Sequence, residues 1–478
     1  MSAPRHRGDI IFALPALPRT AAVLGDPPGW RQDLEERGIE LADLAARPDV
    51  VVADADRAAL AARSGADSVV VEEGGSAVAE LRRAGYHVQR LLSMPTRGTP
   101  GLLLNLEHPR GLRYGIARRG PRGGRWKVVR DRLAPRVLPL GPVSARLPVV
   151  AVGCRHSGPA ALLAAAAQVG VRPAEEHWAM IVTGGTAVRR NAFLLLPPGR
   201  REPDRVLKFA RLPDHTGPFD REERGYELAL AAGRTVVSRC PRPLGRIELD
   251  SYHAALEEAA TGTELTRLLR FPISRKEKLR AVEPVAKWLH DVARETASSF
   301  EAFGPERERL RRVGCPPELV DALPPVPGVF RHNDLGEENV VVDDGSFKVV
   351  DWEWAQCDSL PLADLVFFAQ RILRIIDGAD TDDQREPHFV DLMLGRAPGS
   401  EIAFRWIREE VEVLGIPPEA VGTLVSLSLH ERGARGTEKR RDAERLTGAT
   451  IAPSFPERTL AAWLSEPSLG PDWDRWRA

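Results

Sequence analysis

The sequence predicts an α/β unit followed by an α+β domain, and three observations support this fold class. Within the first 92 residues, short apolar runs alternate with helical segments, which is typical of βαβ units and a mostly parallel sheet. Between residues 180 and 258, β-type runs separated by glycine-containing breaks predict hairpins. After residue 262, helical periodicity dominates apart from one polar hairpin, so the second domain should have a small β-rich part and a larger helical part.

Length and composition favour a multidomain protein. A chain of 478 residues is too long for one core, and we divide it into segments 1–148, 149–262 and 263–478. Apolar residues make up 43% and charged residues 28%, which is the profile of a soluble globular protein. Lys plus Arg and Asp plus Glu both total 67, and this neutral balance gives no support for a nucleic-acid partner.

Cysteine usage and the N-terminal stretch favour a cytoplasmic protein. The four cysteines are far apart and form no CxxC pair, which argues against a zinc site or a disulfide framework. The apolar stretch at residues 10–17 is broken by Pro15 and is too short to span a bilayer. We therefore expect no membrane insertion, and the sequence leaves the oligomeric state open.

The first segment predicts a Rossmann-like α/β unit without a visible site. Its predicted strands lie at residues 21–25, 50–53, 68–71 and 86–92. The loop after the first strand contains two prolines and does not match GxGxxG, the phosphate-cradling signature. The unit is faintly similar to a methyltransferase, but a scaffold or docking role is the favoured interpretation. The following residues 94–148 are rich in Pro, Gly and Arg and predict a linker-like tail.

One polar stretch, residues 330–354, predicts a phosphoryl-transfer centre. Asp-Gly between two β-branched runs is a strong hairpin signal, and folding the hairpin about Gly345 brings Asn339 and Asp351 to its open end. Cross-strand Cβ atoms lie roughly 5 Å apart, so an amide oxygen and a carboxylate can converge on one Mg²⁺ ion. Asp334 precedes Asn339 by five residues and can accept a proton from a substrate hydroxyl that attacks phosphorus.

The spacing of these polar residues carries a family resemblance. The motif His332-x-Asp334-x-x-x-x-Asn339, followed by Asp351-Trp-Glu and Pro-Leu-Ala-Asp364-Leu, resembles the aminoglycoside phosphotransferase and choline kinase-like family. These proteins are small-molecule relatives of the protein kinases, and the resemblance covers roughly residues 175–470. It implies a protein-kinase-like bilobal fold with a small β-rich N-lobe and a helical C-lobe. Asn333 is a departure, because Gly is more usual at that position.

The resemblance also implies roles for individual residues. Asp334 would be the catalytic base, and Asn339 and Asp351 would be metal ligands. Asp364 would support the catalytic loop from the following helix. His332 is expected to brace this loop and to hold Asp334, rather than to act as a general base.

A nucleotide site is expected in the N-lobe. Free backbone N–H groups at a predicted hairpin tip could cover phosphates, and this tip consists of Gly184, Gly185 and Thr186. Lys208, on the next predicted strand, matches the lysine that the family uses for the α- and β-phosphates. Backbone groups near Glu258 to Ala260 would meet adenine, according to the same resemblance.

The partner of Lys208 is left open by the sequence. Three carboxylates on the helix after this strand are candidates, namely Glu222, Glu223 and Glu227. Glu223 is favoured because of its place in the first turn.

The predicted function is that of an ATP- and Mg²⁺-dependent phosphotransferase acting on a hydroxyl of a small molecule, such as a sugar, an aminoglycoside or an amino alcohol. Two alternatives remain: a catalytically silent kinase-fold scaffold, and a bifunctional chain with a methyltransferase-like first domain. ATP and GTP are not distinguished. Candidate acceptor contacts are Glu353, Trp354 and either His430 or Glu431, and the mixed charge run at residues 431–445 predicts a solvated face.

Overall fold

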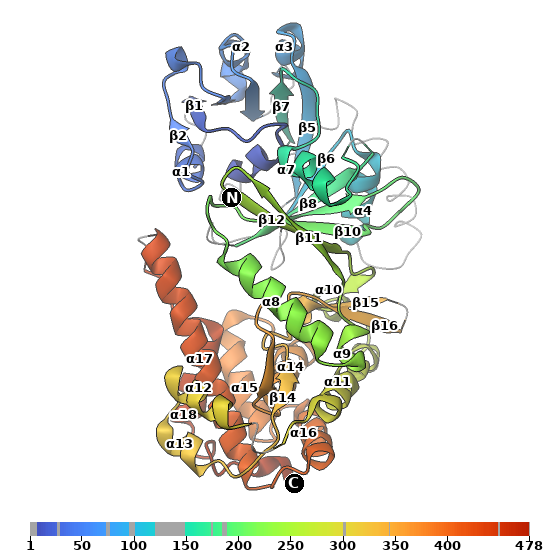
Figure 1. The fold of residues 1–478 in the computed structure, drawn as a ribbon, viewed down its shortest axis with the longest axis vertical. Coiled ribbons are helices and arrows are strands. Elements are labelled where there is room, and N and C mark those ends of the chain that lie inside the picture. The colour runs from blue at the N-terminus through green and yellow to red at the C-terminus, as the bar shows by residue number, and fades with distance from the viewer. Residues whose placement is uncertain are drawn as a thin grey trace. The chain divides into compact units, whose positions relative to one another are not determined.

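A computed structural model of the chain divides into two compact units (Figure 1). It describes residues 7–25, 29–72, 77–94, 101–119, 149–173, 175–183, 189–299, 303–343, 345–447 and 450–477. Unit 1 comprises Met1–Phe219 and Arg242–Ala259, and unit 2 comprises Asp220–Pro241 and Ala260–Ala478. The predicted boundary at residue 148 therefore falls inside one compact unit.

Unit 1 is built on one large sheet whose described strands number twelve. Across the sheet, the strands follow the order β11 (Pro243–Leu249), β12 (Tyr252–Glu258), β10 (Arg205–Phe209), β9 (Asn191–Leu196), β8 (His177–Val182), β6 (Gly101–Asn105), β5 (His87–Met94), β7 (Val149–Cys154), β4 (Ser68–Glu72), β3 (Val50–Ala53), β1 (Thr20–Leu24) and β2 (Glu40–Leu41). Strands from the predicted first and second segments thus share hydrogen bonds in a single sheet.

The strands predicted for the first segment, β1, β3, β4 and β5, run in one direction, but the sheet of unit 1 as a whole is mixed. Only the pairs β1–β2, β1–β3 and β3–β4 are parallel among the described pairs, and every pair from β4–β7 onward is antiparallel. Strand β7 lies between β4 and β5 and runs opposite to both, so β5 has the same direction as β4 although the two strands are not paired. All six of its residues are buried, so this strand requires a neighbour on each side.

The prediction of a linker-like tail after residue 94 is wrong where the structure describes it. Strand β6 lies between β5 and β8, and helix α4 (Pro109–Arg119) packs beside it. Gly111 makes this packing possible, because a Cβ there would lie 2.1 Å from the carbonyl oxygen of Trp178. Glycine and proline near the ends of both elements hid them from the sequence pattern. The Arg-rich part of this segment lies outside the described residues.

Helices cover both faces of the parallel strands in unit 1. Val51 and Val69 face a cluster with α2 (Ala58–Ala62) and α3 (Ala77–Arg83), whereas Val50 and Val70 face a cluster with α1 (Trp30–Glu35) and the short helix Arg7–Ala13. Successive side chains of a strand point to opposite faces, which explains these alternate assignments. The other α-helix described in unit 1 is α7 (Ala161–Ala165).

Unit 2 is mainly helical. Its helices are α8 (Gly217–Ala231, which begins in unit 1), α9 (Arg234–Val237), α10 (Leu265–Leu269), α11 (Arg275–Thr296), α12 (Gly304–Arg312), α13 (Pro317–Ala322), α14 (Ala363–Ile376), α15 (Arg385–Met393), α16 (Ser400–Leu414), α17 (Ala420–Thr447) and α18 (Phe455–Ser465). Two small sheets accompany them, β13 (Thr263–Glu264) with β15 (Val340–Asp343) and β16 (Ser346–Val349), and β14 (Val329–Arg331) with β17 (Gln356–Ser359). Among the described helices of the chain, none is both long and apolar enough to cross a membrane.

The centre of unit 2 is helix α14, which is buried on nearly all sides although it carries Asp364, Gln370, Arg371 and Arg374. Almost every side chain from Ala363 to Ile376 is buried, and α11, α15, α16 and α17 contact this helix. A helix that is buried on nearly all sides must have other elements packed around it. Because only β17 and a short connection separate α14 from the 330–354 stretch, this helix gives the predicted site a rigid base.

Candidate active site

The predicted hairpin is present and has the expected register. Strands β15 and β16 pair antiparallel, with Val340 opposite Val349 and Asp343 opposite Ser346. The N–H of Val350 donates to the carbonyl oxygen of Asn339 at 3.0 Å, which places Asn339 one residue out of register with Asp351. The two predicted metal ligands thus leave the same end of the hairpin.

The loop between β14 and the hairpin is held by the carboxylate of Asp364. Its Oδ2 accepts the N–H of His332 at 2.6 Å, and its Oδ1 accepts the N–H of Asn333 at 3.0 Å. Asp364 lies in the first turn of α14 and is 6% exposed, so the loop is fixed to the most buried helix of the unit. Hydrogen bonds to a carboxylate are among the stronger ones in proteins.

His332 connects the loop to the hairpin. Its Nδ1 accepts the N–H of Asp334 at 3.2 Å, so its Nε2 carries the hydrogen and donates to the carbonyl oxygen of Val350 at 3.0 Å. The ring also contacts the indole of Trp352, with centroids 4.6 Å apart. One imidazole therefore sets the distance between Asp334 and the residue that precedes Asp351.

Asn339 contacts the same loop directly. Its Nδ2 donates to the carbonyl oxygen of Asp334 at 2.8 Å, which leaves Oδ1 as the atom available to a cation. Asp351 has a φ of +67°, a left-handed conformation that turns the chain sharply at the end of the hairpin. The structure thus brings Asp334, Asn339 and Asp351 together around His332.

These residues offer a cation few protein ligands. Within the described residues, no group of three or more His, Cys, Asp and Glu side chains could hold a metal ion. One carboxylate and one amide oxygen remain, from Asp351 and Asn339. This oxygen set suits Mg²⁺, which retains waters and takes substrate phosphate oxygens as its other ligands.

Asn333, the departure from the family pattern, has a conformational reason. Its φ is +67°, in the left-handed region where glycine is favoured and asparagine is the commonest alternative. The Asn333 side chain adds what glycine could not, because its Nδ2 donates to the carbonyl oxygen of Trp354 at 2.9 Å and to Oε1 of Gln356 at 2.8 Å. The substitution therefore keeps the backbone and ties the loop to the chain beyond Asp351.

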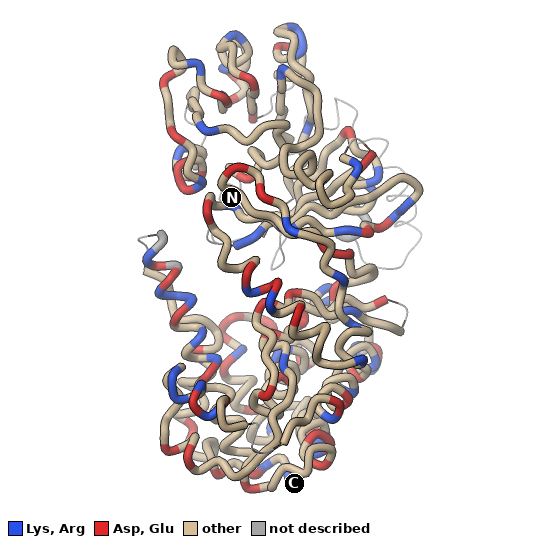
Figure 2. Tube along the Cα trace, viewed as in Figure 1, with Lys and Arg blue, Asp and Glu red and all other residues tan. Residues whose placement is uncertain are grey.

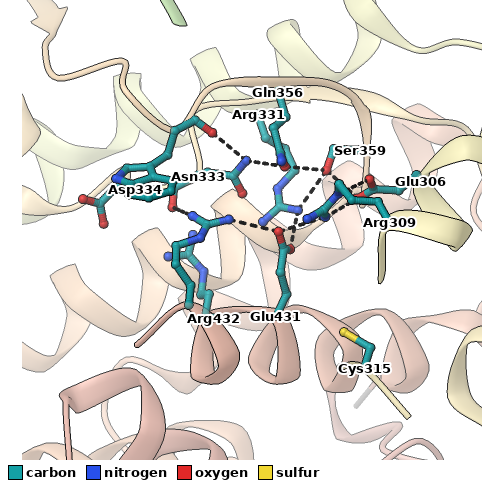
Figure 3. Close-up of polar contacts among 12 residues, drawn as sticks. Glu306, Arg309, Cys315, Arg331, Asn333, Asp334, Gln356, Ser359, Glu431 and Arg432 are labelled. Atoms are coloured by element: carbon teal, nitrogen blue, oxygen red, sulfur yellow. Dashed lines mark hydrogen bonds and ion pairs between the residues drawn. The ribbon is translucent and has the colours of Figure 1, made fainter. Parts of the chain in front are cut away.

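A buried network of charges lies behind this loop (Figure 3). Arg331 donates from Nη1 to Ser359 Oγ at 3.0 Å and to Glu431 Oε2 at 2.9 Å, and Arg309 pairs with the other oxygen of Glu431 at 2.9 Å. Glu306 accepts from both Ser359 and Arg309. Figure 3 shows the Asp334 carboxylate pointing away from this network, which leaves it available for chemistry.

Glu431 was predicted to begin a solvated face, and this prediction is wrong for the first turns of the run. The Glu431 side chain is 2% exposed and Arg432 is 7% exposed. Burial alone would raise the pKa of Glu431, but the charges of Arg331, Arg435 and Arg309 hold that pKa far below its usual range. Burial lowers the pKa of Arg432 to about 9, although Asp364 opposes the shift from 3.4 Å.

A tight approach of α8 to the hairpin end was not visible in the sequence. Gly225 in the middle of α8 lies against the backbone of Trp352, since a Cβ at this position would come within 1.9 Å of the Trp352 carbonyl oxygen. Glycine weakens a helix interior by about 1 kcal/mol relative to alanine, so its presence there calls for a local reason. Contact with the residue next to Asp351 supplies that reason.

The predicted nucleotide residues belong mainly to unit 1. Lys208 on β10 lies opposite Ala255 on β12, and its Nζ pairs with Glu257 at 3.0 Å. Glu258 ends β12 and Ala260 opens the second stretch of unit 2. Glu223 lies on α8 in unit 2, and its pairing with Lys208 stays a prediction.

The predicted phosphate-covering tip lies outside the described residues. Gly184, Gly185 and Thr186 fall between strands β8 and β9, which pair antiparallel as a hairpin. Their role in covering phosphates therefore stays a prediction.

Solved structures that are similar to this chain include proteins named as phosphotransferases or kinases. No family model and no curated protein matches the chain. Similar solved structures include a protein of Ralstonia eutropha JMP134 assigned to the aminoglycoside phosphotransferases, which is 14% identical with a TM-score of 0.40, and the match covers 63% of this chain and 92% of that one. Another is the aminoglycoside phosphotransferase APH(3'')-Id of Streptomyces rimosus ATCC10970, at 18% identity, a TM-score of 0.33 and coverage of 56% and 95%. A glucosamine kinase matches at 13% identity, a TM-score of 0.31 and coverage of 66% and 85%. The chain is thus similar to small-molecule phosphotransferases, the kind of protein that its motifs resemble.

Proposed function

We propose that the protein is an ATP- and Mg²⁺-dependent phosphotransferase that transfers a phosphoryl group to a hydroxyl of a small molecule. The observation that supports this best is the placement of Asp334, Asn339 and Asp351 around one imidazole, with Asp364 fixing the loop to α14. A base and two oxygen ligands are the groups that phosphoryl transfer requires.

Each residue has a defined task in this proposal. Asp334 accepts the proton of the acceptor hydroxyl, because its carboxylate points away from the buried network. Asn339 and Asp351 hold the metal ion, and Lys208 orients the phosphates. When bound, Mg²⁺ would neutralise negative charge on the phosphates of the nucleotide. Most of the rate enhancement then comes from positioning and charge neutralisation.

A panel of hydroxylated small molecules tests the function through acceptor-dependent ADP release. With an acceptor that supports turnover, Asp334→Asn should lower kcat by about 10²–10⁴-fold, the usual contribution of a positioned base. Asp343→Asn is the matched control, because Asp343 is an exposed carboxylate at the opposite end of the same hairpin. Activity that survives in Asp334→Asn would remove Asp334 from the mechanism. Mg²⁺-dependent ATP binding without ADP release across the panel would favour a silent scaffold instead.

A further inference from the structure

Three cations surround the indole of Trp354 in unit 2. The Cζ atoms of Arg221 and Arg435 lie 4.8 and 5.0 Å from the ring centroid, and Nζ of Lys439 lies 4.5 Å from it. Contacts between a cation and the face of an indole ring are favourable. We call Trp354 with these three residues the cation cluster.

The three positive charges repel one another. Since each lies within 5.0 Å of one centroid, any two are within about 10 Å, which does not exceed the Debye length of about 10 Å at 0.1 M salt. Arg435 and Lys439 are also four residues apart on α17, a spacing at which like charges are neighbours on the helix surface and destabilise the helix. Cation–π contacts with one ring do not remove this repulsion.

The carboxylates near the cluster already have other partners. Glu431 pairs with Arg435 at 3.0 Å, but it is also shared with Arg309 and Arg331. Glu353 lies 3.8 Å from Arg221 and accepts the indole N–H of Trp354.

Lys439 and Arg435 differ in how far nearby carboxylates balance their charges. Lys439 is exposed, and within the described residues no ion-pair partner is found for it. Burial lowers the pKa of Arg435, and the charge of Glu431 opposes that shift. Arg221 thus lies 3.8 Å from Glu353, and the charges of Glu431 and Asp334 both act on Arg435, so Lys439 is the member of the cluster whose charge has no ion pair among the described residues.

The cluster is tied to the residue that precedes the proposed base. Arg435 Nη1 donates to the carbonyl oxygen of Asn333 at 3.2 Å, and Asn333 Nδ2 donates to the carbonyl oxygen of Trp354 at 2.9 Å. A molecule bound to the cluster would thus lie beside Asp334, where the acceptor hydroxyl must be.

We propose that the acceptor carries an anionic group, a phosphate or a carboxylate, in addition to its hydroxyl, and that Arg221, Arg435 and Lys439 bind this group. The inference rests on the proposed function and names its substrate class. In the reaction, a bond forms between the acceptor oxygen and the γ-phosphorus of ATP, and the bond from that phosphorus to the ADP oxygen breaks. The hydroxyl proton goes to Asp334. A polycationic acceptor would be repelled at this place.

Binding to the full chain provides the first test, with glucose, glucose 6-phosphate, glucuronate, glucosamine, inorganic phosphate and sulfate as probes in calorimetry. We expect the anions to bind more tightly than glucose and glucosamine. Lys439→Gln and Arg221→Gln should each weaken anion binding at least 10-fold, while Lys439→Arg should retain it. Arg441→Gln is the control, because Arg441 is exposed on the same helix but lies two residues from Lys439 and faces elsewhere.

Several results would overturn the proposal. They are an absence of anion binding to the wild type, equal binding by the wild type and both Gln variants, or faster ADP release with glucose or glucosamine than with the anionic sugars. Loss of binding of a non-hydrolysable ATP analogue in Lys439→Gln, with anion binding unchanged, would assign the cluster to the nucleotide and also overturn it. Cluster-dependent anion binding without ADP release from any probe has a different meaning: the anion site stands and the phosphotransferase function fails.

Discussion

Three non-glycine residues at the candidate site adopt a left-handed backbone conformation. Asn333 and Asp351 have φ of +67°, and Leu362, just before α14, has φ of +65°. Asn and Asp enter this region readily, whereas a leucine does so at a cost of roughly 1–2 kcal/mol. Such strain is kept only where the surroundings hold it, and here Glu410 accepts the N–H of Leu362 at 2.8 Å.

Substitution of Asn333 separates its two contributions. Asn333→Gly keeps the left-handed backbone but loses the hydrogen bonds to Trp354 and Gln356, so we expect lower kcat with a folded loop. Asn333→Ala also adds backbone strain of roughly 1–2 kcal/mol and should be less stable than the glycine variant. Urea unfolding and acceptor-dependent ADP release measure both effects. Equal kcat for wild type and Asn333→Gly would show that the side chain has no positioning role.

Glu410 gives unit 2 a pH-dependent stability. Burial raises its pKa to about 8, with the N–H of Leu362 opposing and the charge of Asp364 adding to the shift. The folded state therefore keeps a proton that the unfolded state releases above its ordinary pKa of 4.5. The contribution of Glu410 to the free energy of unfolding is fully present below about pH 4.5. It falls by at most about 1.4 kcal/mol per pH unit between that pH and about pH 8.

Glu410→Gln should remove this dependence. The amide oxygen can still accept the N–H of Leu362, and it carries no titratable proton. We expect the free energy of unfolding of the variant, relative to wild type, to rise steadily between pH 5 and pH 8. Urea titrations at several pH values measure it. Parallel curves for the two proteins over this range would contradict the role of Glu410.

At the scale of elements, the site depends on the close packing of α8. Gly225→Ala would place a Cβ within 1.9 Å of the Trp352 carbonyl oxygen, so either α8 or the chain after Asp351 must move. We expect a loss of roughly 1–3 kcal/mol of stability and a lower kcat. Gly304→Ala in α12 is the control, since a Cβ there meets no atom within 4 Å and should leave both unchanged or raise stability slightly. Wild-type activity in Gly225→Ala would show that the hairpin end tolerates displacement.

The elements that local patterns define could be predicted, and those that tertiary packing defines could not. The hairpin about Gly345 was visible because turn chemistry and β-branched residues agree there, and its register followed from the turn. In α17, mixed charges indicated solvent exposure, although the helix enters the core at Glu431 and buries that charge against arginines distant in sequence. Figure 2 shows both signs alternating along this helix, a pattern that does not reveal which turns are buried.

The spacing of the motif placed Asp334, Asn339, Asp351 and Asp364 near one another, as the structure shows, whereas the residues that support them could not be predicted. Arg331 and Arg435 reach the loop from β14 and α17, and no local pattern brings these elements together. The cations around Trp354 also come from two helices that are far apart in the sequence. Residues that hold a site in place come from elements distant in sequence and leave no local motif.

At the scale of the whole molecule, the first 148 residues supply the strands with which β7 and β8 pair. Strand β7 is paired with β4 and β5, and β8 is paired with β6. A chain truncated to residues 149–478 would lose these partners and expose both edges of β7 and one edge of β8. We expect it to aggregate or to unfold at lower temperature than the full chain, as measured by light scattering and calorimetry. A truncated chain that is monomeric and folded would show that residues 149–478 fold independently.

The position of β7 has a consequence for synthesis on the ribosome. Both neighbours of β7 are complete by Met94, but β7 itself ends at Cys154. At about 5–20 residues per second, β4 and β5 of a nascent chain therefore lack the strand that pairs with both of them for several seconds. During that interval β4 and β5 would present open edges to other nascent chains and to chaperones. Slowing or pausing translation between these two points should therefore lower the yield of native protein more than the same delay placed after residue 154.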